Sequence, residues 1–495
     1  MAEHTKVGGH IGGVGDVHFY PRVPQSPDVE NTLRTMGEDS KPVFLSEYGI
    51  GSMMDVVHEA RMYEQLGVRP DIEDYALVRS MAERLTADWK RFGMEGVYAF
   101  PEYFLRDSQL RMARHRLLGF NLIRANPKIC GFNLTGMLDH GLTGEGVWRF
   151  LRDWKPGVMD AMQDGWAPLR WCLFVNPTHA YVGRPVKLEG VLANEDVLRP
   201  GEYTARFRVC GPAGVAWERA ATLRVPTLPP GEDGPLAIPV MAEEVVLSGP
   251  EGDYELAVNV EQGAAATEAF WQFHLTDPNS LPRLEQTVTL WGIPANVESW
   301  LKAHGVSGEK FGGAGPSRRE IILVGDLSKT GSDAEAWKEL ARRMARGSTV
   351  VFLSQEAFKR EKDAVAWLPL AKKGRCYEFN DWLYHKECVA KAHPVFEGLQ
   401  GRGILDWYYY GPVIPHHLFD GQETPSEVIA AAFAAGYSTR GGYASGILLG
   451  AYHFGEGQFI LNTFPVLDQL DHHPAADRLL LNLVKYAAGF LVLHG

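Results

Sequence analysis

The segment Lys41-Pro-Val-Phe-Leu-Ser-Glu47-Tyr-Gly-Ile-Gly-Ser52 is the part of the chain that most clearly indicates its fold. Residues 42–45 form an apolar run without period-2 alternation, which is typical of a parallel strand buried on both faces. The run ends at Ser46 and Glu47. Enzymes built on barrels of parallel strands carry their catalytic groups at the carboxyl ends of the strands. We therefore predict a buried strand that presents Glu47 at its end; the alternative is a structural glutamate paired with an arginine.

Two other segments also have the pattern of a strand that ends in polar residues. Upstream stands Gly15-Asp-Val-His18-Phe-Tyr20-Pro21, and downstream stands Pro127-Lys-Ile-Cys-Gly-Phe-Asn133-Leu-Thr-Gly-Met137. Together with Phe44-Leu-Ser-Glu-Tyr-Gly49 they resemble the ends of the sixth, seventh and eighth barrel strands of family-2 glycoside hydrolases. That family includes β-galactosidases, β-glucuronidases and β-mannosidases. The downstream segment departs from the family pattern, because Leu134 or its neighbours stand where a Trp is usual.

The resemblance implies a fold and a function for residues 1–165. They are expected to form the C-terminal part of a (β/α)8 TIM barrel, strands six to eight, with Glu47 as the nucleophile of a retaining β-glycosidase. Tyr20 would approach the nucleophile, and His18 and Asn133 would bind substrate. Short polar side chains suit this task, because a sugar hydroxyl both donates and accepts hydrogen bonds. The expected substrate is a β-linked oligosaccharide or glycoside, without a cofactor or a metal.

The acid/base carboxylate is missing from this pattern. A retaining glycosidase needs two carboxyl groups about 5–5.5 Å apart. In the resembled family the acid/base Glu follows an Asn at the end of strand four, before the nucleophile. The only Asn-Glu pair here is Asn194-Glu195, which comes after it. We therefore expect this chain to be the C-terminal part of a longer or split enzyme, with Glu102 as the one local carboxylate that would substitute.

An enlarged connection separates the nucleophile segment from the downstream segment. Apolar residues at spacings of three and four predict a helix from Asp71 to Gly93. An aromatic turn and a second helix, residues 108–125, follow. Phe100 and Tyr103 in the turn are candidates to line a sugar subsite, the alternative being aromatic core. Further polar residues near the strand ends are Thr135, Asp139 and His140.

After residue 166, apolar and polar residues alternate with a period of two. Tyr203, Ala205, Phe207 and Val209 alternate with polar residues, and similar runs begin at Tyr254 and Ala269. Clusters of Gly and Pro divide these runs. Short alternating strands of this kind indicate an antiparallel, immunoglobulin-like β-sandwich over residues 166–277.

Strands and helices alternate from residue 284 to the C-terminus. The expected strands are residues 287–290, 321–324, 349–353, 446–449 and 458–462, and the expected helices are 296–304, 333–345 and 474–488. This order predicts a doubly wound parallel α/β sheet of the flavodoxin type. Residues 393–399 and 455–462 resemble class I glutamine amidotransferase-like domains. Such an enzyme needs an activated Cys, and Ser354 follows the third of these strands instead, so we expect a non-catalytic domain.

The composition excludes some classes of binding partner. The chain of 495 residues has 49 basic and 61 acidic side chains, a formal charge of −12, and no basic stretch interleaved with aromatics, which argues against nucleic acid. Its five cysteines, Cys130, Cys172, Cys210, Cys376 and Cys388, have no metal-ligand spacing and are expected as buried free thiols. The first residues lack the apolar core of a signal peptide, and no membrane association is expected. Protein partners would be a second copy of the chain or a complementing N-terminal chain.

Two alternatives from other function classes remain. One is a non-catalytic carbohydrate-binding or scaffold protein derived from such an enzyme. The other is a hydrolase that uses Ser354 in the α/β domain. The sequence Phe352-Leu-Ser-Gln-Glu356 lacks the Gly-x-Ser-x-Gly elbow that such a hydrolase requires.

Overall fold

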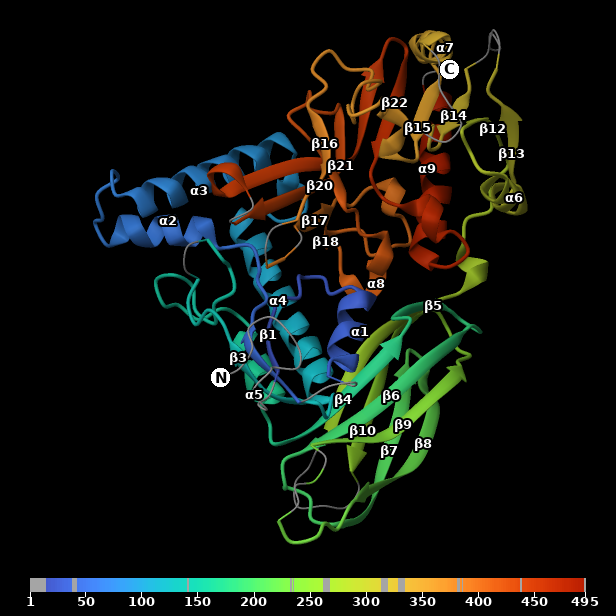
Figure 1. The fold of residues 1–495 in the computed structure, drawn as a ribbon. Helices are drawn as coiled ribbons and strands as arrows, with labels where there is room; N and C mark the ends of the chain where they lie inside the picture. The colour runs from blue at the N-terminus through green and yellow to red at the C-terminus, as the bar shows by residue number, and fades with distance from the viewer. Residues whose placement is uncertain are drawn as a thin grey trace. The chain divides into compact units, whose positions relative to one another are not determined.

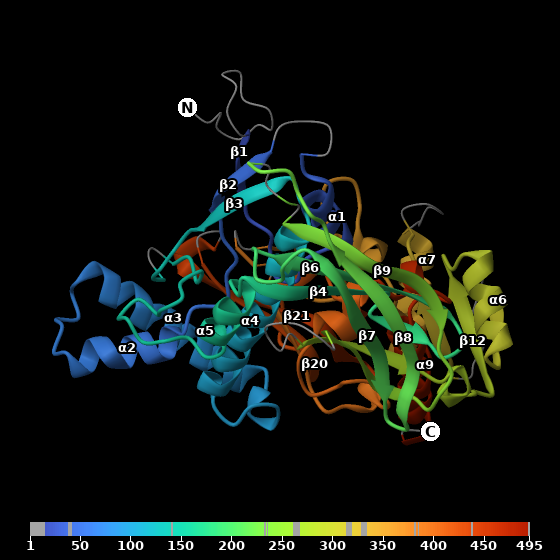
Figure 2. The ribbon, with the colours of Figure 1, turned by 90° about the horizontal axis from the view of Figure 1, so that it is seen from below.

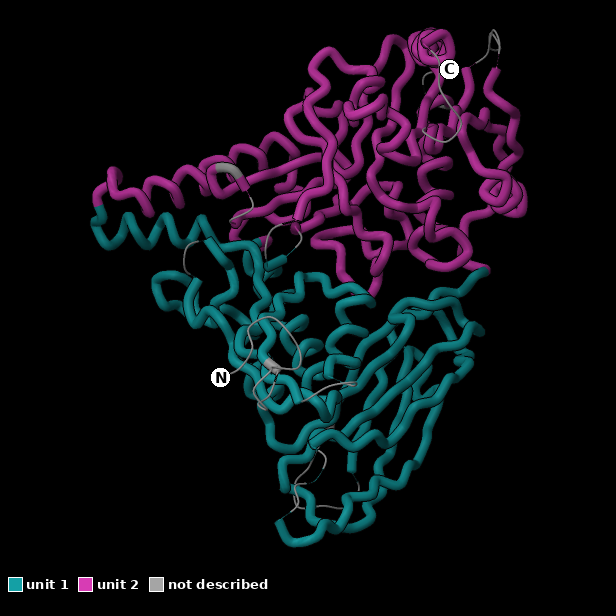
Figure 3. The backbone as a smooth tube through the Cα atoms, viewed as in Figure 1, with its two compact units in different colours: residues 1–68, 105–278, 381–385 teal, residues 69–104, 279–380, 386–495 magenta. Residues whose placement is uncertain are grey.

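A computed structural model describes residues 15–37, 42–139, 142–231, 234, 236–260, 268–312, 319–327, 334–380, 383–384, 386–436 and 439–493. The chain is multidomain and mixed α/β, and it divides into two compact units (Figure 3). Unit 1 contains residues 1–68, 105–278 and 381–385, and unit 2 contains residues 69–104, 279–380 and 386–495. Within the described residues, no helix has the length and apolar character needed to cross a bilayer.

Unit 1 begins with a parallel three-stranded sheet. Its strands are β1 (Gly15–Phe19), β2 (Val43–Tyr48) and β3 (Ile129–Leu134), paired in chain order and lying side by side in Figure 2. Helix α1 (Pro27–Thr35) connects β1 to β2, and α2 (Val56–Gln65) follows β2. Helix α4 (Pro101–Arg124) precedes β3, and α5 (Val158–Gly165) follows it.

The pattern of burial explains the central strand. Val43, Leu45 and Tyr48 are fully buried, whereas Phe44, Ser46 and Glu47 keep partial exposure. The predicted parallel strands at these three positions are confirmed by their pairing. The described residues contribute only three strands to this sheet, so a closed barrel is not formed by them and the barrel assignment stays a prediction.

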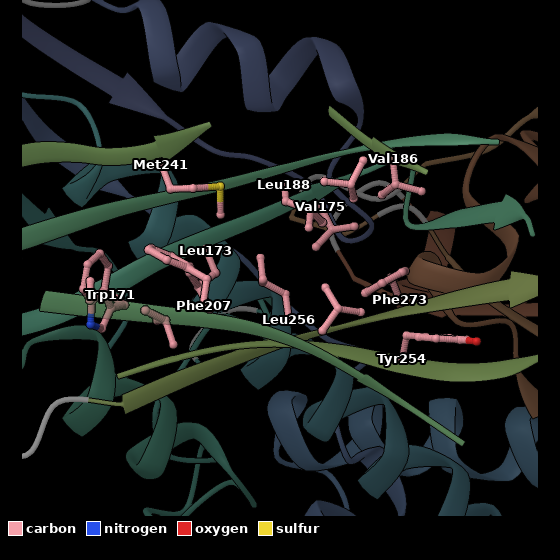
Figure 4. Packing of buried hydrophobic residues seen from close by; sticks show 14 of the residues in the cluster. Trp171, Leu173, Val175, Val186, Leu188, Phe207, Met241, Tyr254, Leu256 and Phe273 are labelled. Atoms are coloured by element: carbon pink, nitrogen blue, oxygen red, sulfur yellow. The ribbon is translucent and has the colours of Figure 1, made fainter. Parts of the chain in front are cut away.

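Two β-sheets make up the rest of unit 1. One consists of β4 (Leu169–Asn176), β6 (Pro185–Asn194) and β9 (Ala237–Val246). The other has the order β5 (His179–Tyr181), β11 (Glu268–Thr276), β10 (Gly252–Val260), β7 (Gly201–Gly211) and β8 (Gly214–Val225). Side chains from both sheets, among them Trp171, Leu173, Phe207 and Leu256, fill one core (Figure 4). The predicted sandwich is therefore present; its pairing is antiparallel except for β5 with β11, and its immunoglobulin-like identity is untested.

The sheet of unit 2 is parallel in one half. Strands β12 (Gln286–Trp291), β13 (Val306–Lys310), β14 (Ile321–Val324), β15 (Thr349–Phe352) and β22 (Gly457–Asn462) pair in the spatial order β13-β12-β14-β15-β22 (Figure 1). This is the 2-1-3-4-5 order common among doubly wound sheets. Helix α6 (Ala295–Ala303) packs on β13, α7 (Ala334–Ala345) on β22, and α9 (Pro474–Leu493) on β14 and β15.

The other half of this sheet is antiparallel. It continues through β21 (Tyr443–Phe454), β20 (Glu427–Ala435), β17 (Glu387–Ala390) and β18 (Gly403–Ile404). Strand β19 (His417–Asp420) also pairs with β21, and β16 (Arg375–Glu378) pairs with β19. A short helix, α8 (Trp407–Tyr410), precedes β19. The prediction of a wholly parallel sheet is wrong here, and residues 446–449 lie in the antiparallel strand β21. Only Gly455 and Glu456 join β21 to β22, which permits a hairpin but not the long crossover that parallel strands require.

Helix α3 (Glu73–Arg91) belongs to unit 2, although it lies within the segment predicted as the first domain. Trp89 packs against Phe433 of β20, with ring centroids 5.3 Å apart. Asp88 accepts hydrogen bonds from the hydroxyls of Ser445 (2.6 Å) and Tyr443 (3.1 Å). The compact units therefore cut across the predicted boundary at residue 165, because the partners of α3 come from the C-terminal half of the sequence.

Candidate functional site

The candidate site lies in unit 1, where β2 places Glu47 on the partly open face of the parallel sheet. Glu47 pairs in register with His18 of β1, and the next residue, Tyr48, pairs with Leu134 of β3. Because successive side chains of a strand point to opposite faces, buried Tyr48 and Glu47 face opposite ways. The Glu47 side chain is 37% exposed. It is therefore open to an incoming ligand.

Two side chains from the end of β1 hold the Glu47 carboxylate. The Tyr20 phenol donates a hydrogen bond to Oε2 of Glu47, and Nδ1 of His18 lies 3.0 Å from the same oxygen. Burial, followed by the hydrogen bond to Glu47, raises the pKa of Tyr20 to about 12. The phenol is therefore a proton donor throughout the neutral range, and it stabilises negative charge on Glu47.

A second carboxylate, Glu145, lies on the far side of Tyr20. The Thr135 hydroxyl donates to Oε2 of Glu145 at 3.1 Å, and Thr135 also hydrogen-bonds to the Tyr20 phenol. A Cβ atom on Gly49 would lie 2.5 Å from Oγ1 of Thr135 and 2.6 Å from Oε2 of Glu145. Glycine is thus required at position 49 for these groups to meet. Polar contacts run from Glu47 through Tyr20 and Thr135 to Glu145.

Glu145 is enclosed and does not share the accessibility of Glu47. Its residue is only 3% exposed. Its side chain fills the space beside Gly136, where a Cβ would lie 2.2 Å from Cγ of Glu145. The Arg116 side chain, itself fully buried, donates to the backbone oxygen of Glu145. This burial suits Glu145 to positioning Thr135 and Tyr20 rather than to contact with a leaving group.

The segment between β3 and α5, called here the β3–α5 loop (residues 135–157), is anchored by a buried ion pair. Nζ of Lys155 lies 2.6 Å from Oδ1 of Asp139, and both side chains have no exposed surface. Lys155 also donates to the backbone oxygen of Gly144 at 2.7 Å, and the Gly146 amide donates to Asp139 at 2.7 Å. Asp139, noted from the sequence as a candidate polar site residue, therefore has a structural role.

The other residues predicted for the site have different positions. Asn133 lies in β3 with an exposed side chain, and strand alternation puts it on the same face as Glu47. Phe100 and Tyr103 belong to unit 2, where their exposed rings lie 6.2 Å apart, and Glu102 lies with them in unit 2. The site of unit 1 therefore contains His18, Tyr20, Glu47 and Asn133 but not these three. His140 lies outside the described residues.

Sequence reasoning missed Glu145. The only local signal is the pair of glycines that flank it in Thr143-Gly-Glu-Gly146. Gly144 has a φ of +64°, which favours glycine, and a Cβ on Gly146 would lie 2.3 Å from the amide nitrogen of Asp139. Flanking glycines of this kind indicate a tightly folded loop, but they do not reveal that its carboxylate meets Tyr20 and Thr135.

Unit 2 shows no comparable arrangement around its candidate nucleophiles. Oγ of Ser354 accepts a hydrogen bond from the amide of Glu356 and caps a short helical turn. Burial raises the pKa of the Cys376 thiol to about 12, which keeps it protonated and unreactive at neutral pH. Cys388 is buried in β17. In the part of the chain that the structure describes, no cluster of His, Cys, Asp and Glu side chains is arranged to bind a metal.

Comparison with known proteins identifies no family. No family model matches the chain, and no curated protein matches it. Among solved structures, R. palustris CsgH matches at 16% identity and a TM-score of 0.14, over 21% of this chain and 91% of CsgH. An exo-β-1,4-mannosidase from Opitutaceae bacterium strain TAV5 matches at 10% identity and a TM-score of 0.24, over 43% of this chain and 35% of the mannosidase.

A β-glucuronidase from Bacteroides uniformis also matches, at 12% identity and a TM-score of 0.20, over 61% of this chain and 30% of that enzyme. The chain thus spans about a third of the length of the two glycosidases. TM-scores this low do not establish a common fold. The functional argument therefore rests on the contacts around Glu47.

Proposed function

We propose that Glu47 is the nucleophile of a retaining β-glycosidase site that takes a β-linked oligosaccharide or glycoside. One observation carries the proposal. A partly exposed carboxylate stands at the carboxyl end of the central strand of a parallel sheet, where a phenol and an imidazole hold one of its oxygens. A carboxylate nucleophile must be fixed beside the anomeric carbon, and both neighbours hold the Glu47 carboxylate in one position.

The reaction proceeds by two displacements at the anomeric carbon. In the first, an oxygen of Glu47 forms a bond to this carbon while the bond to the leaving oxygen breaks, and an acid protonates that oxygen. In the second, water attacks the glycosyl ester and releases Glu47, with its proton going to the same residue, now a base. The phenol of Tyr20 offsets the returning negative charge on Glu47 at the end of the cycle.

The acid/base residue is proposed to come from outside this chain, as part of a longer or split enzyme. Glu145 is too enclosed to reach a leaving oxygen. General acid catalysis contributes about 10²–10⁴-fold. The chain alone is therefore expected to turn over natural oligosaccharides poorly, and an N-terminal chain that completes the sheet would restore turnover.

Covalent labelling tests Glu47 without the acid. Activated 2-deoxy-2-fluoro-β-glycosyl fluorides carry a leaving group that needs little protonation, so they require only the nucleophile. A panel of gluco-, galacto-, manno- and glucurono-configured reagents should label the peptide that contains Glu47. Glu47→Gln should abolish labelling, whereas Glu64→Gln, a change at an exposed residue of α2, should not. Labelling of another carboxylate, or persistence in Glu47→Gln, would refute the assignment.

A non-catalytic carbohydrate-binding or scaffold protein is the second candidate. The observation that favours it is the burial of Glu145, the carboxylate linked to Glu47 through Tyr20 and Thr135, which is only 3% exposed. This candidate predicts no covalent labelling by any reagent of the panel, while reversible binding of oligosaccharides remains.

A further inference from the structure

The β3–α5 loop carries two tryptophans whose rings meet edge to face. The ring centroids of Trp148 and Trp154 lie 4.9 Å apart with an interplanar angle of 64°. Trp154 is 55% exposed, and Trp148 is partly buried. We call this pair the tryptophan platform. The exposed ring of Trp154 offers a flat apolar face on which a ligand can pack.

The platform is fixed in place by its own loop. The amide of Trp148 donates to the backbone oxygen of Met137 at 3.0 Å, and its backbone oxygen accepts from Asp139 at 3.0 Å. On the other side of Trp154, Lys155 is held by the buried ion pair with Asp139. A ring fixed in this way loses little conformational entropy when a flat ligand packs on it.

Polar groups adjoin the platform. Asp153, the residue before Trp154, accepts a contact from Nε2 of His58 at 2.6 Å, and the two side chains are 40% and 35% exposed. A carboxylate offers several acceptor sites, so Asp153 retains capacity for a hydroxyl donor. Adjacent residues thus supply an exposed aromatic ring and a carboxylate, which suit the apolar C–H face and the rim of hydroxyls of a pyranose ring.

We propose that the tryptophan platform binds a sugar ring of the oligosaccharide at a position beyond the ring that contacts Glu47. The substrate class rests on the proposed function. The link between the two positions is the loop itself, because Thr135 and Glu145, which contact the Tyr20–Glu47 pair, belong to the same segment as Trp148 and Trp154. A protein partner fits less well, since a small platform with a half-exposed ionic pair offers little apolar area.

Tryptophan fluorescence provides the test, because it requires no turnover. Cellohexaose, mannohexaose, laminarihexaose and xylohexaose are titrated into the 495-residue chain and into its Glu47→Gln variant. At least one hexaose should give a saturable change in both proteins. Trp154→Ala should weaken that binding at least tenfold without changing the melting temperature. The matched control is Trp166→Ala, since Trp166 is 49% exposed but packs on Phe120 instead.

A second variant separates binding from folding. Asp153→Asn keeps the shape of the side chain and removes its charge. It should therefore weaken binding of the same hexaose while leaving the fold intact. The platform proposal is refuted if no hexaose binds, or if Trp154→Ala binds as the parent does. Covalent labelling of Glu47 without Trp154-dependent binding would refute the platform alone. Trp154-dependent binding without labelling would refute the nucleophile and support the carbohydrate-binding alternative.

Discussion

At the scale of single residues, the carboxylate of Glu47 is held by the phenol of Tyr20 and the imidazole of His18. The phenol of Tyr20 donates to the carboxylate, and its pKa of about 12 means that this proton stays in place at neutral pH. Thr135, which donates to Glu145, also contacts the phenol. The site therefore consists of an accessible carboxylate supported by an enclosed one.

Replacing Tyr20 by Phe removes that proton donor and little else. A hydrogen bond to a charged group contributes about 1.5–3 kcal/mol, so release of the fluoro-sugar from labelled Glu47, the step in which negative charge returns to the carboxylate, should slow by roughly 10- to 150-fold. The slowing should be constant from pH 6 to pH 9, because Tyr20 does not titrate there. Tyr203→Phe, which removes a phenol bonded to Arg199 in the sandwich, should leave the rate unchanged. A rate within twofold of the parent in Tyr20→Phe would show that the phenol does not support Glu47.

Local sequence was sufficient for some site residues and not for others. Glu47, Tyr20 and His18 stand at the ends of recognisable strands, and parallel strands bring their carboxyl ends to one edge. Glu145 lies in a loop, and its position depends on where Lys155 and Asp139 meet. No periodicity encodes that meeting, so the sequence could not reveal the enclosed carboxylate.

At the scale of elements, the β3–α5 loop is tied to α2 through a buried carboxylate. Oε1 of Glu59 accepts the amide of Phe150 at 2.9 Å. Burial, reinforced by repulsion from Asp139, raises the pKa of Glu59 to about 7 from 4.5. The folded protein therefore holds this proton more tightly than the unfolded chain. The resulting stabilisation is complete below pH 4.5 and is lost as the pH rises through 7.

The substitution Glu59→Gln should remove this loss of stability at higher pH. The amide side chain keeps an oxygen for the Phe150 amide but never ionises. The free energy of unfolding of the variant should exceed that of the parent by roughly 2–4 kcal/mol above pH 7, and the difference should vanish near pH 4. Urea unfolding at several pH values measures it, with the exposed Glu64→Gln as the control. If the two proteins show the same pH dependence, Glu59 is ionised in the folded state without cost.

The helices and strands differ in how well the sequence predicts them, and the difference follows the sequence range of the contacts that stabilise them. Helices α6, α7 and α9 and strands β12, β14, β15 and β22 of the parallel half were predicted closely, because each has its own periodicity and boundary signals. The fifth strand of that half, β13, was not predicted. The antiparallel half was not predicted either. Strand β20 contains five alanines, which favour helix as isolated residues, and only its ladder with β21 makes it a strand.

At the scale of the whole molecule, the predicted domains are contiguous in the sequence, whereas the compact units are not. Residues 69–104 are covalently part of the first predicted domain but fold with the C-terminal sheet. The apolar face of α3 that made its helix predictable, including Val78, Met81 and Leu85, is buried in unit 2. The sequence shows that this apolar face must pack against another part of the protein, but it does not show which part.

Cutting the chain between Pro278 and Asn279 tests this division. The fragment 1–278 carries α3 without β20 and β21, so Trp89 loses Phe433 and Asp88 loses the hydroxyls of Tyr443 and Ser445. Exposed apolar helix faces drive association. The fragment alone should therefore bind a hydrophobic dye and self-associate, and fragment 279–495 co-expressed with it should abolish both and copurify in equal amounts. Trp89→Lys in fragment 1–278 should reduce the dye binding but prevent rescue by the second fragment. A monomeric fragment 1–278 that binds no dye would mean that α3 is satisfied by the first 278 residues and that the predicted boundary was right.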